Sequence, residues 1–382
     1  MNGSSEKCWP EARTWAEVSL QRIAANWREL CRAAGGAAVA AVVKANAYGH
    51  GAAAVSRRLE QEGASWFAVS NAEEGAELRR AGVGGRILVM GGFAPFEMDA
   101  FFGRRLTPAV HSIESLLALE ARAAALGQRL AVHIKLDSGM GRLGTREAPQ
   151  EIAAAVARLR HLDVEGVMSH LASAADFGSR QNEEQFDAFD RALEALAAAG
   201  VRPRIAHIGS SAAVCYGLAR AMRQMVRAGL ALYGYVPEAR GAAPEVRVQV
   251  EPALVWRARI VAVQSIPSGA PVGYNARWRA PRDSRIAVVA AGYADGVPHT
   301  LADRGRAIAG GALVPIVGAV SMDVISVYIT GLPPLGPGDA VTLIGQEGAI
   351  RHDAADLARE AGVIPYVILC GLGNRVVRIY RD

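Results

Sequence analysis

Short apolar runs alternate with helical patterns along the first two-thirds of the chain. Each run is rich in aliphatic and β-branched residues, ends at a polar or glycine-rich turn, and precedes a stretch whose apolar residues recur every three or four positions. This alternation predicts parallel strands separated by helices. The predicted strands are residues 39–43, 66–69, 86–89, 106–110, 130–135, 164–168, 205–208 and 225–228.

Eight strand–helix units in roughly 200 residues are typical of a (β/α)8 TIM-like barrel, an α/β fold. A doubly wound open sheet is the alternative, but no Gly-x-Gly-x-x-Gly fingerprint follows the first strand. We therefore expect a barrel within residues 13–245.

The pattern changes after residue 236, where Pro237, Gly241 and Pro244 predict a linker. Beyond it, short alternating runs separated by Gly and Pro predict a smaller, mostly β domain over residues 246–382. Residues 13–19 also alternate, and we expect this N-terminal strand to pack with the second domain. The predicted strands of that domain are 253–263, 286–291, 313–317, 324–329 and 340–344, with one helix near 352–361.

Residues with charged or reactive side chains gather at the ends of the predicted barrel strands or shortly after them. In a barrel, the carboxyl ends of the strands meet at one face, and active sites form there. The pattern therefore predicts one site at that face, formed by Lys44, Lys135, Arg142, His170, His207, Ser210, Ser211, Arg227 and Gly229.

Lys44 comes first in this set and ends the apolar run that includes Val42 and Val43. Removal from water disfavours the ammonium form of a lysine, and the neutral amine is the nucleophile that Schiff-base chemistry requires. A lysine at a strand end can also extend its amine into solvent. Its position alone leaves both interpretations open.

The composition narrows the functional classes. The chain has 382 residues, of which 51% are hydrophobic and 21% charged, and a net charge of +5 without any basic run interleaved with aromatics, so nothing favours nucleic-acid binding. Four cysteines lie far apart without metal-type spacing, which indicates reduced thiols and no metal site. Because neither a signal-peptide core nor a spanning run of about 20 apolar residues occurs, we expect a cytoplasmic protein without membrane contact.

A family resemblance now adds to these observations. The segment Lys44-Ala-Asn-Ala-Tyr-Gly-His-Gly51 resembles the cofactor-lysine motif of the alanine racemases, which carry pyridoxal phosphate on a lysine. The similarity recurs in order over almost the whole chain. It includes residues 135–144, 207–212, 225–234, 273–274, 292–296, 321–323 and 364–366.

The resemblance implies racemisation of L-alanine and D-alanine through a pyridoxal-phosphate aldimine, which would supply D-alanine for peptidoglycan. Lys44 would hold the cofactor and act as the base on one face of the substrate, while Tyr274 would act on the other. Without the family, Tyr274 would be interpreted as a loop tyrosine that covers the core.

The resemblance also implies how the cofactor and substrate are bound. Arg227 would face the pyridine nitrogen and keep it unprotonated, with His170 and His207 bracing the guanidinium. Lys135 would be a carbamylated lysine that orients Arg142, or an unmodified lysine in an ion pair. The phosphate would be bound by Tyr48, Ser211, Gly229, Leu230 and Tyr366, and the substrate by Arg142, Met322 and Tyr293.

The family further implies a head-to-tail homodimer in which Tyr274, Tyr293 and Met322 come from the partner chain. Three positions depart from the usual pattern, and they leave the substrate preference open: Ser210, Ala319 and the turn over residues 275–278.

Three alternatives to an alanine racemase remain. One is a serine or broad-specificity racemase with the same chemistry. Another is a non-catalytic pyridoxal-phosphate-binding protein, although such proteins typically lack a β-domain. A decarboxylase of similar fold would use a cysteine as acid, and the matching turn contains none.

Overall fold

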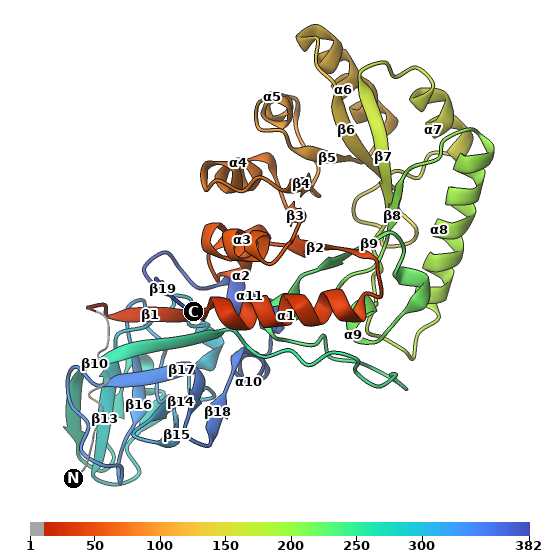
Figure 1. The fold of residues 1–382 in the computed structure, drawn as a ribbon. Coiled ribbons are helices and arrows are strands. Elements are labelled where there is room, and N and C mark those ends of the chain that lie inside the picture. The colour runs from red at the N-terminus through yellow and green to blue at the C-terminus, as the bar shows by residue number, and fades with distance from the viewer. Residues whose placement is uncertain (1–10) are drawn as a thin grey trace. The chain divides into compact units, whose positions relative to one another are not determined.

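The computed structural model describes residues 11–382, which divide into two compact units. One unit is Leu20–Pro252, and the other combines the N-terminal strand with Ala253–Asp382 (Figure 1). The division between Pro252 and Ala253 falls a few residues beyond the boundary expected at 245–246. No helix or strand spans residues 236–252.

The first unit is a near-closed barrel of parallel strands. The strands are β2 (Ala38–Val42), β3 (Trp66–Val69), β4 (Arg86–Val89), β5 (Thr107–Val110), β6 (Leu130–Lys135), β7 (Leu162–Met168), β8 (Ile205–His207) and β9 (Met225–Ala228). Neighbouring strands pair in sequence order from β2 to β8, and β9 returns to pair with β2. The predicted barrel and its strand pattern are confirmed.

The ring closes between β8 and β9 at a single point beyond the end of β8. The Arg227 N–H donates to the Gly209 carbonyl at 3.0 Å, and Ser210 and Arg227 form an isolated bridge. Arg227 therefore lies at the seam of the barrel.

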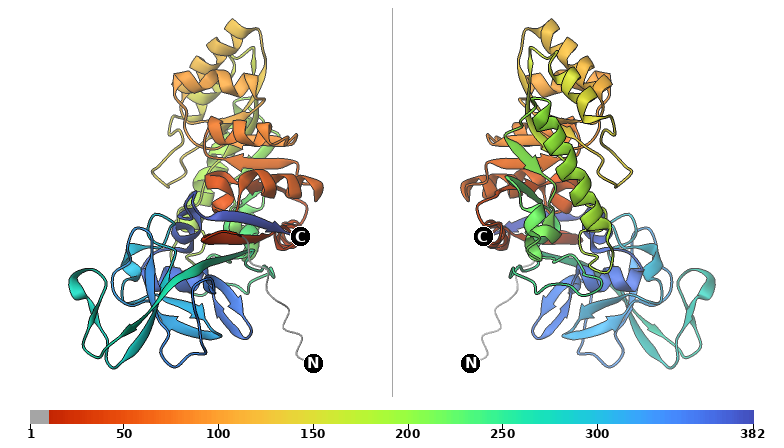
Figure 2. Two further views of the ribbon diagram at one scale, coloured as in Figure 1. Left: turned by 90° about the vertical axis from the view of Figure 1, so that its left-hand side faces the viewer. Right: turned by 90° about the vertical axis from the view of Figure 1, so that its right-hand side faces the viewer.

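Helices follow the strands and appear in chain order from red to green in Figures 1 and 2. They include α1 (Leu20–Ala33), α3 (Ala52–Gln61), α4 (Ala72–Arg80), α5 (Met98–Gly103), α6 (Ile113–Leu126), α7 (Pro149–Val156), α8 (Gln181–Ala198) and the short α9 (Ser211–Cys215). α1 buries Ile23, Trp27 and Leu30, the three residues at helical spacing in its sequence. β3 is buried at all four positions, as expected for a strand in a barrel with packed side chains on both faces.

The second unit is mostly β. Its nine-stranded sheet contains β1 (Thr14–Ser19), β10 (Leu254–Ile266), β13 (Ser284–Val289), β14 (Arg306–Ala309), β15 (Ala312–Pro315), β16 (Ile325–Tyr328), β17 (Ala340–Glu347), β18 (Ile350–His352) and β19 (Val377–Arg381). A separate pair is β11 (Pro271–Val272) with β12 (Trp278–Arg279). Two helices, α10 (Ala354–Ala361) and α11 (Pro365–Cys370), complete the unit.

The N-terminal strand is an integral part of this sheet. β1 pairs antiparallel with β10 and parallel with β19, so the red strand lies between the green β10 and the blue β19 (Figures 1 and 2). Trp15 and Trp256 are fully buried here, and the Trp256 indole N–H donates to Thr14 Oγ1 at 2.8 Å. The sheet thus contains both the first and the last strand of the described residues.

Three of the four cysteines, Cys31, Cys215 and Cys370, are free thiols, and Cys8 lies outside the described residues. Within residues 11–382, the helices are all too short or too polar to cross a membrane.

Candidate active site

Lys44 lies one residue beyond the end of β2, at the strand end that the sequence pattern predicts. It precedes a turn whose backbone is left-handed, unlike that of an ordinary α-helix. Ala45, Asn46, Ala47 and Tyr48 all have φ between 51° and 53°. Left-handed backbone costs about 1–2 kcal/mol per non-glycine residue, so surrounding contacts must stabilise this turn. Strain of this kind concentrates where a backbone position is functional.

Side chains from outside the turn hold it in place. Glu74, on α4, accepts hydrogen bonds from the Ala45 N–H at 2.8 Å and from the Ser70 N–H at 2.7 Å, one at each carboxylate oxygen. Within the segment, Asn46 Oδ1 accepts from the Ala52 N–H at 2.8 Å. The backbone beside Lys44 is therefore fixed to the start of α4 and to the start of α3.

Tyr233 supports the same turn from the end of the barrel sequence. Its hydroxyl donates to the Val42 carbonyl at 2.9 Å. Its ring lies 4.9 Å from the ring of Tyr48 and 4.5 Å from that of His50, measured between centroids. Glu74 and Tyr233 were not singled out from the sequence, because neither follows a strand end in the pattern.

A second cluster of hydrogen-bond donors forms around Ser211 and Gly229. Ser211 Oγ accepts from the N–H of Gly229 at 2.9 Å and from that of Ala231 at 3.3 Å, which leaves its hydroxyl proton free to donate elsewhere. A Cβ atom at Gly229 would lie 2.6 Å from the Tyr48 hydroxyl oxygen. Any residue other than glycine at position 229 would therefore crowd the Tyr48 hydroxyl. The next residue, Leu230, is buried.

The guanidinium of Arg227 is buried and donates to four acceptors. Nη1 lies 2.7 Å from His207 Nδ1, and Nη2 lies 2.7 Å from the Ser169 carbonyl, 3.2 Å from His170 Nδ1 and 3.3 Å from the Ile208 carbonyl. Burial lowers the pKa of Arg227 to about 10, so the group is still charged at neutral pH.

The histidines around Arg227 are neutral. Burial and then the charge of Arg227 lower the pKa of His170 to about 3, and the same two causes hold the pKa of His207 well below its usual value. Each therefore presents an unprotonated Nδ1 to the guanidinium. Arg227, His170 and His207 come together as the sequence analysis expected.

Lys135, at the end of β6, is buried, with 4% of its surface exposed. Burial, followed by the charges of Arg142 and Arg227, lowers its pKa to about 8. A sizeable fraction of the amine is thus neutral and nucleophilic near neutral pH. Arg142 lies on the exposed loop after β6, where Asp137 accepts the N–H groups of Gly139, Met140 and Gly141.

Three of the four predicted site residues of the β unit are exposed. Tyr274 is 69% exposed, Met322 52% and Tyr293 47%. The Tyr293 N–H donates to the Ser321 carbonyl at 2.9 Å, so the segments carrying Tyr293 and Met322 run side by side. Tyr366, in α11, is half-buried.

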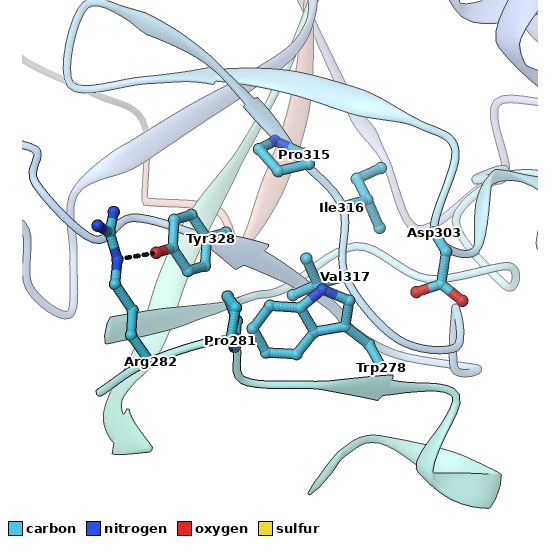
Figure 3. A pocket seen from close by; sticks show the side chains of 8 residues that line it. All are labelled: Trp278, Pro281, Arg282, Asp303, Pro315, Ile316, Val317 and Tyr328. Atoms are coloured by element: carbon cyan, nitrogen blue, oxygen red, sulfur yellow. Dashed lines mark hydrogen bonds between the residues drawn. The ribbon is translucent and has the colours of Figure 1, made fainter. Parts of the chain in front are cut away.

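The β unit also holds an apolar pocket of about 430 Å³, shown in Figure 3. None of the predicted site residues lines it, so it is not part of the candidate site. Its lining is Trp278, Pro281, Arg282, Asp303, Pro315, Ile316, Val317 and Tyr328. Within residues 11–382, no group of three or more His, Cys, Asp or Glu side chains is arranged to bind a metal.

Comparison with known proteins identifies the relatives of this chain. The family model for the alanine racemase N-terminal domain matches residues 18–237, and the model for the alanine racemase C-terminal domain matches residues 253–380. Alanine racemase of Symbiobacterium thermophilum is 39% identical over 368 residues, covering 96% of this chain and 97% of that protein. Alanine racemase of Geobacter sulfurreducens is 37% identical over 374 residues, with coverage of 96% and 97%.

Solved structures that resemble this chain are also alanine racemases. A crystal structure of alanine racemase from Streptomyces lavendulae has a TM-score of 0.91 and 32% identity, and the match covers 98% of each chain. Alanine racemase from Bartonella henselae with covalently bound pyridoxal phosphate has a TM-score of 0.86 and 28% identity, and the match covers 97% of this chain and all of that one.

Proposed function

This chain belongs to the alanine racemase family, and we propose that it interconverts L-alanine and D-alanine with pyridoxal phosphate bound at Lys44. The observation that carries the proposal is a lysine at the end of a barrel strand, on a left-handed turn held by several outside contacts. Strained backbone persists only where surrounding contacts hold it, and it is concentrated at functional sites, so this turn indicates that the position of Lys44 is functionally important.

The residues around the turn fit the phosphate of this cofactor. Ser211 has a hydroxyl proton free to donate, the Tyr48 hydroxyl lies beside Gly229, and the absence of a Cβ at Gly229 leaves space between them. Hydroxyl and backbone N–H donors are the groups that bind phosphate, and none of these groups is acidic. Leu230 would add a backbone N–H, and Tyr366 a further hydroxyl.

When bound, pyridoxal phosphate supplies an electron-accepting ring that makes the Cα proton of an attached amino acid acidic. Two bases are then needed, one on each face of Cα. In the proposal, Lys44 Nζ takes or returns the proton on one face. The Tyr274 hydroxyl takes or returns it on the other.

Arg227 sets the character of the cofactor site. Because its guanidinium remains charged at neutral pH, it has no lone pair to accept a proton and does not readily give one to the cofactor ring nitrogen. The ring nitrogen of a bound cofactor would then stay unprotonated, which would limit side reactions such as transamination. His170 and His207 hold the guanidinium in this orientation.

Lys135 is proposed to carry a carbamate. A neutral amine reacts with carbon dioxide, and a pKa of about 8 provides that form near neutral pH. The modification would replace a cation by an anion in the field of Arg142 and Arg227, which removes like-charge repulsion. Arg142 would then be oriented toward the substrate carboxylate.

The protein is further proposed to act as a head-to-tail homodimer in the cytoplasm, supplying D-alanine for peptidoglycan. In that arrangement, Tyr274, Tyr293 and Met322 of one chain complete the site that contains Lys44 of the other. The exposure of all three side chains supports this, because each would gain a covered environment from the partner.

A substrate panel tests the proposed activity. Purified protein loaded with pyridoxal phosphate is incubated with each L-amino acid, and the products are resolved by chiral chromatography. We expect alanine to be racemised fastest, serine second and bulky amino acids slowly, because Tyr274, Tyr293 and Tyr366 leave little space beyond a methyl or hydroxymethyl group. Faster turnover of lysine or arginine would contradict the proposed specificity.

A further inference from the structure

A line of buried polar side chains extends from Arg227 across three further strands. His207 on β8 bonds Arg227 through Nδ1, and its Nε2 lies 2.8 Å from Nδ1 of His133 on β6. Nε2 of His133 lies 3.6 Å from Oε2 of Glu165 on β7. His133 and His207 have no exposed surface, and Glu165 has only 7%.

The chemistry of the two ends dictates where the protons lie. A guanidinium only donates, so His207 Nδ1 must accept and the His207 proton must be on Nε2. That proton is donated to His133 Nδ1, so the His133 proton is also on Nε2. It then faces the carboxylate of Glu165, the negative charge at the far end, across 3.6 Å.

The Glu165 end is built to keep a negative charge. Arg86 donates to both carboxylate oxygens of Glu165, and an Arg204 Nη2 lies 3.7 Å away. The facing His133 ring and Arg86 lower the pKa of Glu165 to about 2, whereas burial lowers the pKa of His133. Both ring systems between the charged ends are therefore neutral.

The residues around His133 pack closely against it. A Cβ atom at Gly166 would lie 2.6 Å from His133 Nδ1, so a side chain at this position would displace the imidazole. The Trp66 ring packs 5.6 Å from His133, and the Arg86 guanidinium lies 4.4 Å over the same indole. His133 Nε2 is buried and makes no direct hydrogen bond, and the Glu165 carboxylate faces it across 3.6 Å.

We propose that Glu165 is a positioning residue for Arg227, acting through His133 and His207. The carboxylate fixes the tautomers of both rings, so that His207 always offers an acceptor to Nη1 of Arg227. Nη2 is held by two carbonyls and His170, and Nε–H takes part in none of these bonds. The guanidinium is thereby held in one orientation, with Nε–H left to meet a ligand.

This inference rests on the proposed role of Arg227 toward the cofactor ring, and its test separates the two. The first measurement uses wild-type apoenzyme labelled with 15N-histidine. We expect the signals of His133 and His207 to show neutral rings protonated on Nε2, unchanged between pH 6 and 9. A proton on Nδ1 of either ring would overturn the proposal without bearing on racemase activity.

The second measurement compares two variants on the same strand. Glu165→Gln keeps the shape and an acceptor but removes the charge, whereas Asp163→Asn removes an exposed carboxylate that pairs with Arg204 at 2.7 Å. We expect Glu165→Gln to shift the ring signals of both His133 and His207, because it removes the negative charge that faces His133 Nε2 at 3.6 Å and favours a proton on that atom. Asp163→Asn should shift neither.

The functional link is measured as the dissociation constant of pyridoxal phosphate, determined by fluorescence with apoenzyme of each variant. Glu165→Gln should bind the cofactor roughly 3- to 30-fold more weakly than wild type, the range for changes transmitted through a network, and Asp163→Asn within twofold. If Glu165→Gln shifts only His133, or binds the cofactor as Asp163→Asn does, Glu165 does not position Arg227. Racemase activity of the wild type tests the proposed function separately.

Discussion

The two halves of the proposed site differ in what surrounds them. In the barrel, Lys135, His207 and Arg227 are buried, and every nitrogen of His207 and most donors of Arg227 have partners. In the β unit, Tyr274 and Met322 are among the most exposed large hydrophobic side chains of the described chain. The barrel half is pre-organised by its own hydrogen bonds, whereas the side chains of the β half are open to solvent in the single chain.

This difference indicates how each half responds to substitution. A buried, hydrogen-bonded group contributes to stability as well as to binding, because its removal leaves partners without hydrogen bonds. An exposed side chain contributes little to the free energy of unfolding. Substitutions in the β half should therefore change activity alone, and substitutions in the barrel half should change both.

The largest effect is expected at Lys44. Lys44→Ala removes the cofactor anchor and one base, so activity should fall by roughly 10⁴-fold or more. Borohydride reduction followed by peptide mapping checks the assignment. The sequence has only three lysines, Lys7, Lys44 and Lys135, so the pyridoxyl label distinguishes them clearly. A label on Lys7 or Lys135 would refute the assignment.

Tyr274→Phe should lower kcat by roughly 10²- to 10⁴-fold, the usual contribution of a general acid–base group. Its melting temperature should equal that of wild type because the side chain is exposed. Tyr380→Phe, at another exposed tyrosine of the β unit, is the control and should keep full activity. A lower melting temperature for Tyr274→Phe would contradict the view that the Tyr274 side chain is exposed and makes no stabilising contact.

Mixing these two inactive variants tests whether the halves come from different chains. Lys44→Ala and Tyr274→Phe are unfolded together and refolded. Random pairing makes half of the dimers hybrid, each with one intact site, so about a quarter of wild-type activity should return. If both residues belonged to the same chain, every site would keep one lesion and no activity would return.

Gly229→Ala should weaken pyridoxal-phosphate binding by roughly 10- to 100-fold, because the added Cβ displaces the Tyr48 hydroxyl from the phosphate donors. Equilibrium titration of apoenzyme with cofactor measures the change. Gly103→Ala is a matched control, since a Cβ at Gly103 meets no atom within 4 Å. Equal affinities of the two variants would show that this cluster does not bind the phosphate.

The smallest effect concerns stability at Lys135. Its pKa is about 8 in the folded protein and near 10.5 when unfolded, so burying the charge destabilises the fold fully below pH 8. This cost declines as pH rises from 8 to 10.5, because the folded state loses its proton first. In carbonate-free buffer, Lys135→Met should raise the melting temperature by roughly 1–4 °C at pH 7.

The gain from Lys135→Met should shrink toward zero above pH 10.5. Thermal melts of both proteins over the pH series measure it. A gain that stays constant with pH would show that the lysine is not held in the charged, buried form, and added bicarbonate should reduce the gain at pH 7 if a carbamate forms.

The sequence by itself determined the barrel, because each strand is a short apolar run and each helix has its own period. β3 and β4 have the predicted bounds, residues 66–69 and 86–89, and β6 and β9 match as well. The positions of Lys44, Lys135 and Arg227 at strand ends also followed from this local pattern. The strands β11, β12, β14, β18 and β19 were not predicted. Of these, β11 and β12 have only two residues each, which is too short to show any alternation.

Only the tertiary structure decided how the site is held. The left-handed turn after Lys44 has no glycine over residues 45–48, and its partner Glu74 lies 29 positions from Ala45. The line from Arg227 to Glu165 joins residues on four strands, with His133 and His207 separated by 74 positions. Local periodicity carries no information about such contacts, because they depend on which strands become neighbours when the barrel closes.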